Sequence, residues 1–199
     1  TFRAAVNWFF IHVFQARDVL ATFHALPLLG RLVVPVLGGA LAGGLSAWAG
    51  RLPGGQGMGD VMEAVVLGGR HVSLRASLLK AGGSWSAIVS GGSIGREGPL
   101  IQFGGALGAS VGKLLGIRRD ERRRALIAAG AAAGFAAAYN TPIAAVLFVV
   151  EVVTGVVALE VVLPAFLAAA LATTLSRRAM GAGPLYGQHT FVMRNEAEL

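Results

Sequence analysis

The sequence has 199 residues, of which 55% are hydrophobic, only 14% are charged and 29 are glycine. A soluble domain averages about 25% charged residues, so this composition argues against one and indicates a helical protein that spans a membrane several times. Cysteine is absent from the sequence, which excludes disulfides, thiol chemistry and cysteine-based metal sites. The net charge of +7 fits arginines in cytoplasmic loops, and we expect no nucleic-acid partner.

The N-terminal part of the chain is apolar. Residues 6–14 form a run shorter than the ~20 residues that a membrane helix needs, and the sequence starts with Thr1, so we expect it to begin inside a longer one. Residues 32–50 carry no charge and are predicted to form a spanning helix. Gly39 and Gly43 give that helix a face of small residues, which we expect to pack closely against a neighbouring helix.

A glycine-rich turn, GGQGMGD at residues 54–60, leads into a short apolar segment at residues 61–67. It is a weak candidate for a nucleotide loop, because no strand precedes it and its spacing is not G-x-G-x-x-G. A basic cluster follows the segment. Its side chains either extend toward the membrane interface or raise the local anion concentration near a vestibule, and its members are Arg70, His71, Arg75 and Lys80.

The most informative stretch is GGSIGREGP at residues 91–99. Its glycines permit a sharp turn, and Pro99 suits the first turn of a helix because the N–H it lacks would have had no intrahelical partner. The free N–H groups of that new helix carry the positive end of its dipole. This is an anion-binding geometry, and the carboxylate of Glu97 is an anion already in place.

The helix that follows repeats glycine every fourth residue, which predicts close packing against another helix; these glycines are Gly104, Gly108, Gly112 and Gly116. Residues 118–124 hold five arginines and are predicted to form a cytoplasmic loop. Residues 125–150 are uncharged, but the Asn-Thr-Pro sequence at residues 140–142 interrupts them. A residue before proline is disfavoured in a helix, so two short helices are predicted at residues 125–138 and 143–150. Such interrupted helices line the ion sites of transporters.

The C-terminal part is predicted to hold one further apolar helix, at residues 159–175, ending at Arg177 and Arg178. Residues 181–199 are polar enough for a linker or tail. One alternative is an intramembrane serine protease, because Ser93 lies in a glycine-rich turn. That class needs a histidine base on a facing helix, and the four histidines all lie at the edges of segments, so no catalytic residue is predicted.

GREGP at residues 95–99 resembles the G-[KR]-E-G-P signature of the CLC family of chloride channels and chloride/proton exchangers. Lys80 stands where the family usually carries a lysine, and residues 128–151 are similar to the family's next two helices. The resemblance extends over residues 32–179. It implies an all-α, multi-pass integral membrane protein with the CLC inverted-repeat fold of broken and tilted helices. It also implies transport of an anion such as chloride.

The resemblance further implies a domain organisation. Residues 1–180 would be the first transmembrane repeat, and residues 181–199 a linker toward a second repeat that this sequence lacks, since the G-x-F-x-P loop of that repeat does not occur. This sequence would then contain only the first repeat's part of the anion site. We expect a homodimer surrounded by membrane lipid, in the bacterial plasma membrane, without enzymatic activity, metal or cofactor other than the bound anion.

By resemblance, Glu97 is the gate, which leaves the anion site when it is protonated. Lys80 is the best candidate for a vestibule cation. Residues 55–59 fall where the family has G-S-G-I-P, with Gln56 in place of the serine and Gly59 in place of the proline, so side-chain contact and ion preference are in question. The implied anion-binding residues are Gln56, Gly57, Met58, Gly95, Arg96, Glu97 and Gly98.

Residues 151 and 152 indicate whether transport is coupled to protons. Exchangers of the family commonly carry two adjacent glutamates here, and the second relays protons, but this sequence has Glu151 followed by Val152. The valine favours channel-like or weakly coupled transport. Glu151 is either a displaced relay or a solvated or ion-paired helix-end carboxylate. One alternative is a proton-coupled antiporter, whose selectivity for an anion other than chloride would follow from Gln56. Another is a non-transporting membrane scaffold.

Overall fold

The computed structural model describes residues 6, 8, 9, 11, 12, 26–55, 57–68, 72–95, 97–155 and 158–180. Regular structure within these residues is helical, without a strand, as the all-α prediction required. The elements are α3 (Leu28–Gly50), α4 (Met58–Val66), α5 (Leu74–Val89), α6 (Glu97–Leu114), α7 (Asp120–Tyr139), α8 (Pro142–Phe148), the π-helix η1 (Val149–Thr154) and α9 (Leu159–Met180).

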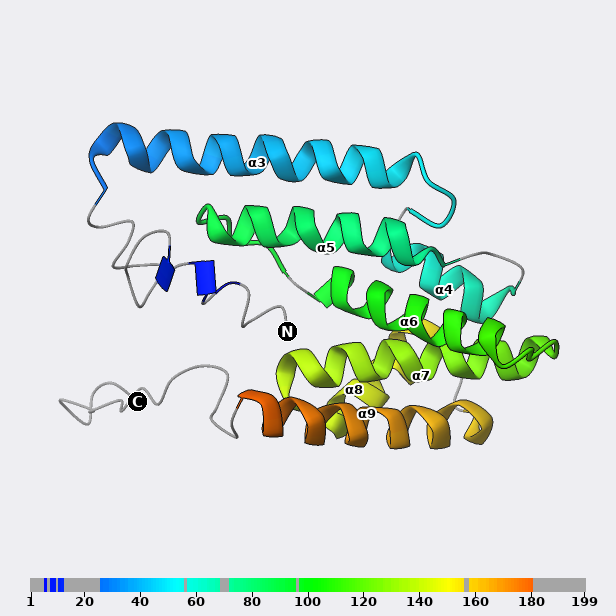
Figure 1. Cartoon of the computed structure of the whole chain (residues 1–199). Helices are drawn as coiled ribbons and strands as arrows, with labels where there is room; N and C mark the ends of the chain where they lie inside the picture. The colour runs from blue at the N-terminus through cyan, green and yellow to red at the C-terminus, as the bar shows by residue number, and fades with distance from the viewer. Residues whose placement is uncertain are drawn as a thin grey trace, which may run out of the picture.

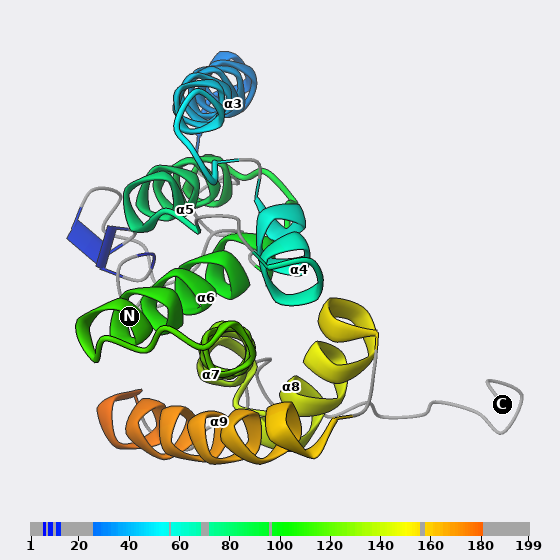
Figure 2. The same cartoon turned by 90° about the vertical axis from the view of Figure 1, so that its right-hand side faces the viewer.

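The helices lie in successive layers. Figure 1 shows α3, α5, α6, α7 and α9 following one another across the molecule, with α3 on one outer side and α9 on the other. In Figure 2, which looks along several helix axes, α4 lies beside α6, with which it is in contact, and α7 is enclosed by its neighbours. Helix α7 contacts α4, α6, α8, η1 and α9, and its inward face is made of alanines that are fully buried, such as Ala128, Ala131 and Ala132.

Glycines hold α6 and α7 in direct backbone contact. A Cβ atom added at Gly104 would overlap the backbone carbonyl of Gly130, and one added at Gly108 would overlap that of Leu126. Gly112 faces the Leu126 side chain, whose Cδ1 would lie 3.2 Å from such an atom. The close packing predicted from the glycine repeat is therefore present, except at Gly116, which occupies a turn with φ 65° after the helix.

The two long apolar helices predicted from the sequence are present as α3 and α9. Among the described helices, these two have the length and composition for a membrane crossing, over residues Leu28–Gly50 and Leu159–Ala179. The predicted contact face of α3 is wrong for the described chain, because no atom lies within 4 Å of a Cβ added at Gly39 or Gly43. Gly38 faces α5 instead, and its carbonyl accepts a hydrogen bond of 3.3 Å from the Ser86 hydroxyl.

The predicted break at residues 140–142 is confirmed. Helix α7 ends at Asn140, which adopts the left-handed conformation with φ 61°, and α8 begins with Pro142. The start of α7 differs from the prediction, because Asp120 rather than residue 125 is its first residue. Acidic residues in a first turn are stabilised by the helix dipole, so Asp120 and Glu121 extend the helix into the arginine-rich segment.

One arginine of that segment holds α4 in place. The guanidinium of Arg124 donates hydrogen bonds to the carbonyls of Val66, at 3.0 Å, and Leu67, at 3.1 Å. These carbonyls belong to the C-terminal end of α4, where a cation also complements the negative end of the dipole. Residues 120–124 of the predicted loop thus form the first turns of α7, and Arg124 in this part of the helix hydrogen-bonds to the end of α4.

Candidate anion site

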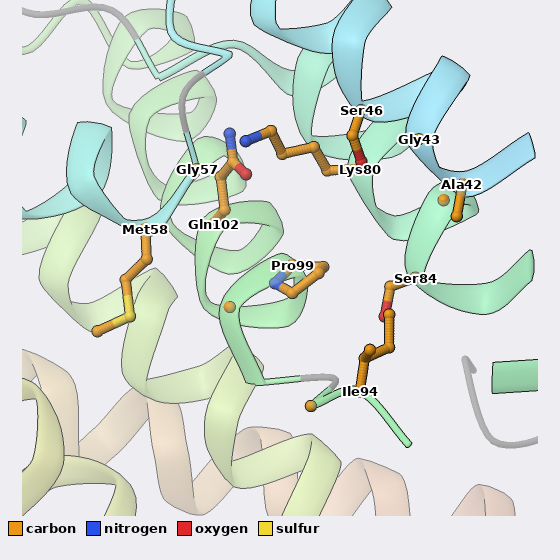
Figure 3. A pocket seen from close by; sticks show the side chains of 13 residues that line it. Ala42, Gly43, Ser46, Gly57, Met58, Lys80, Ser84, Ile94, Pro99 and Gln102 are labelled. Atoms are coloured by element: carbon orange, nitrogen blue, oxygen red, sulfur yellow. The ribbon is translucent and has the colours of Figure 1, made fainter. Parts of the chain in front are cut away.

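A pocket of about 400 Å³ opens between α3, α4, α5 and the start of α6, and Figure 3 shows the side chains around it. Five of the predicted anion-binding and vestibule residues line it: Gly57, Met58, Lys80, Gly95 and Gly98. The structure therefore brings together the N-terminal ends of α4 and α6, which are about forty residues apart in the sequence (57 against 97). Gln56 and Arg96 lie outside the described residues, as do Arg70 and His71.

The N-terminus of α4 already carries an anion. Gly57 caps the helix with φ 111°, and its N–H donates a 3.2 Å hydrogen bond to the carboxylate of Asp60, whose own N–H donates to the Gly57 carbonyl at 3.1 Å. The Asp60 carboxylate thus caps the helix N-terminus as the acidic residue of a capping box does, and Asp60 is 1% exposed. Gly57 was predicted to bind an anion, whereas its N–H is taken by Asp60, which was not predicted although an acid three residues after a glycine cap is a recognisable signal.

Lys80 supplies a full positive charge to the wall of the pocket. Its Nζ lies over the same helix end, at 3.0 Å from where a Cβ of Gly57 would be. Lys80 is half-buried in α5 and interacts electrostatically with Asp60. The cation and the carboxylate therefore partly compensate each other's charge on this side of the pocket.

Two buried polar side chains in the pocket wall were not predicted. Gln102 is fully buried, and its Nε2 donates to the Gly54 carbonyl at 3.2 Å, while its Oε1 has no hydrogen-bond partner among the described residues. The hydroxyl of Ser84, which is 5% exposed, likewise has none there. Buried polar groups are nearly always hydrogen-bonded, so both mark a place where solvent or a ligand is expected. The only sequence signal was a polar residue within an apolar helix.

Glu97 lies at the edge of the site. It is the first residue of α6, and its Oε1 accepts a hydrogen bond from the hydroxyl of Tyr139, the last residue of α7. Glu97 is not among the described residues that line the pocket, although the neighbouring Gly95 and Gly98 are. This contact between the ends of α6 and α7 was not predicted from the sequence.

Residues 38–199 match the family model described as voltage gated chloride channel. The chain belongs to this family. The resemblance seen in residues 95–99 is thereby confirmed. Members of the voltage-gated chloride channel family are channels and transporters rather than enzymes, which removes the serine-protease alternative based on Ser93.

Relatives of the chain carry names of chloride-transporting proteins. A ClcB-like chloride channel protein by name, from Ralstonia nicotianae, is 38% identical over 118 residues, which is 58% of this chain and 28% of that protein. Proteins named H(+)/Cl(-) exchange transporter ClcA, from Vibrio campbellii and Vibrio cholerae, are 48% and 41% identical over 49 residues. Each of these shorter matches covers 25% of this chain and 10% of the relative. The chain thus matches a minor part of the length of these relatives.

The remaining predicted residue, Glu151, lies apart from the pocket lining. It belongs to the π-helix η1, and both it and Val152 are exposed, whereas Val153 is buried. The structure therefore does not bring Glu151 together with the residues of the anion pocket. Within the described ranges, no group of three histidine, aspartate or glutamate residues is placed to hold a metal ion.

Proposed function

We propose that the chain is the first repeat, residues 1–180, of a protein that transports chloride or a similar anion across the bacterial plasma membrane. The observation that carries the proposal is the pocket in which the N-termini of α4 and α6 meet Lys80. Family membership supports the same function. Residues 181–199 would lead to the second repeat that completes the site, and the complete subunits would form a homodimer surrounded by lipid.

We infer that anion binding in this pocket depends on partial positive charges and on one cation, Lys80, whose charge Asp60 partly compensates. The start of α6 contributes the positive end of its dipole, Ser84 contributes a hydroxyl that can donate a hydrogen bond, and Lys80 contributes attraction that Asp60 moderates. Gly57, Met58, Gly95 and Gly98 line the same space, and Gln56 and Arg96, which lie outside the described residues, are proposed as further anion-binding residues by family resemblance. Moderate attraction suits transport, because an ion that binds too tightly does not leave.

Glu97 would act as the gate. As a carboxylate at the start of α6 it is attracted to the same helix end as a permeating anion, so the two compete. A protonated Glu97 has no such attraction and would leave the position to the anion. The Glu97 carboxylate lies beside the pocket, next to the lining residue Gly98. It would therefore move only a short distance to exchange places with an anion.

The transport mode we propose is passive or weakly proton-coupled. Protons need titratable groups or ordered water to cross a ~30 Å hydrocarbon core, and Val152 offers none at the family's relay position. A proton-coupled antiporter is the alternative, with Glu151 as a displaced relay. The names of the Vibrio relatives, which are exchange transporters, favour that alternative.

The test uses the complete protein in liposomes loaded with chloride. Lys80→Met should raise the chloride concentration for half-maximal flux several-fold, because the pocket loses its cation. The matched control is Lys113→Met, since Lys113 is an exposed lysine at the opposite end of α6. Flux no greater than that of empty vesicles from the wild-type protein would show a non-transporting scaffold. Equal effects of the two variants would contradict the role of Lys80.

A further inference from the structure

We propose that Tyr139 is a latch that holds the carboxylate of Glu97 beside the anion pocket rather than in it. The inference rests on the proposed gating role of Glu97. The Tyr139 hydroxyl donates a hydrogen bond to Glu97 Oε1, and Glu97 is absent from the described residues that line the pocket. A donor on α7 thus offers the carboxylate a second position, which competes with the start of α6.

The hydroxyl is well fixed in space. The Tyr139 ring lies 4.9 Å from the ring of Phe135, which in turn stacks at 4.9 Å on Phe148 of α8. Directly after Tyr139 the chain leaves the helix at Asn140, whose side chain accepts a 2.6 Å hydrogen bond from Arg177 on α9. Side-chain packing on one side and a capped helix end on the other therefore limit where the hydroxyl can move.

The distance between the latch and the gate is also fixed, because α6 and α7 touch through backbone. A Cβ at Gly134 of α7 would overlap the carbonyl of Leu100 of α6, only three residues after Glu97. This contact lies near the end of α7 that bears Tyr139 and near the end of α6 that bears Glu97. The two helices cannot slide or separate there without losing the contact, so the hydroxyl stays within reach of the carboxylate.

The expected effect follows from competition between the two positions of the carboxylate. A hydrogen bond to a charged group contributes enough to change an equilibrium by roughly tenfold or more. While Tyr139 holds the carboxylate, the pocket is available to an external anion. Without the hydroxyl, the carboxylate occupies the helix end more often, and the apparent affinity for chloride falls by the fraction of time that the pocket is blocked.

The experiment measures chloride binding to the complete, purified protein by titration calorimetry, together with flux in liposomes. Tyr139→Phe keeps the ring and its contacts and removes only the hydroxyl. It should raise the apparent Kd for chloride by between about threefold and about tenfold and leave flux at saturating chloride unchanged. The same substitution in a Glu97→Ala background should have no effect, because no carboxylate is left to hold.

Three results would be decisive against the latch or its premise. An unchanged chloride Kd in Tyr139→Phe would overturn the latch, and so would an equal change with and without Glu97, which would indicate a purely structural role. If Glu97→Ala alone changes neither chloride binding nor flux, the gating proposal itself fails. If Tyr139→Phe does not fold, chloride-induced infrared difference spectra of the wild-type protein with isotope-labelled tyrosine decide the question, since the latch requires a shifted tyrosine band that Glu97→Ala abolishes.

Discussion

The backbone contact between α6 and α7 can be tested with one added methyl group. Gly108→Ala would place a Cβ atom against the carbonyl of Leu126 and within 3.2 Å of the Cα of Ile127. All of the nearest atoms are backbone, so no side chain can rotate away to make room. The helices must separate locally, or α6 must shift along α7. Gly44→Ala is the matched control, because an added Cβ there meets no atom within 4 Å in the described chain.

The magnitude combines two opposing effects. Alanine is favoured over glycine inside a helix by roughly 1 kcal/mol, a gain that applies to both variants. Overpacking of a close contact costs about 1–3 kcal/mol, and the rigid neighbours of Gly108 put it at the upper end. Gly108→Ala should therefore lower the free energy of unfolding by about 2 kcal/mol, whereas Gly44→Ala should leave it unchanged or raise it by up to about 1 kcal/mol.

The assay is equilibrium unfolding of the complete protein in mixed micelles, followed by circular dichroism. The difference between the two variants should be about 2–3 kcal/mol, well outside the roughly 0.5 kcal/mol typical of neutral substitutions. If the two variants lie within about 0.5 kcal/mol of each other, the α6–α7 contact does not have the closeness described here.

Three further outcomes concern the gate, the relay and the anchoring of α4. Flux through the wild-type protein should rise as pH falls, because protonation removes the charge by which Glu97 competes with the anion. Glu97→Gln should remove most of this pH dependence. A pH profile of the variant like that of the wild type would contradict the gating role of Glu97. A chloride gradient across proteoliposomes should not drive sustained proton movement, and uphill proton transport that Glu151→Gln abolishes would make Glu151 the relay. Arg124→Gln should lower the free energy of unfolding by about 1 kcal/mol, because α4 loses its C-terminal donor, while the exposed Arg122→Gln should be neutral; equal losses would show that the contact is unimportant.

The parts of the fold that were predictable depend on neighbours in the sequence. The break between α7 and α8 follows from Pro142, which disfavours helix at the residue before it. The close approach of α6 follows from a four-residue glycine repeat, which leaves one side of the helix without side chains. The same argument failed for Gly39 and Gly43, because a pattern of small residues does not say which side of a helix meets a neighbour.

The parts of the site that were missed depend on tertiary contacts. Tyr139 and Glu97 are brought together by the packing of α6 on α7, and no spacing in the sequence encodes that pair. Gln102 becomes notable only because its position in α6 is fully buried and its Oε1 lacks a partner in the described chain. The helix start at Glu97 was predictable because a glycine turn, an acid and a proline together define it from local chemistry alone.

The capping of α4 by Asp60 has a kinetic consequence for any anion that enters the pocket. A tethered carboxylate cannot diffuse away, so it reduces the depth of the potential well permanently rather than only at some ionic strength. Escape from a well slows about tenfold for every 1.4 kcal/mol of depth. A shallower well therefore means shorter dwell times and faster turnover at a given driving force. Under the proposed function, Asp60 would therefore shorten the dwell time of an anion by its charge alone, from a position at the cap of α4.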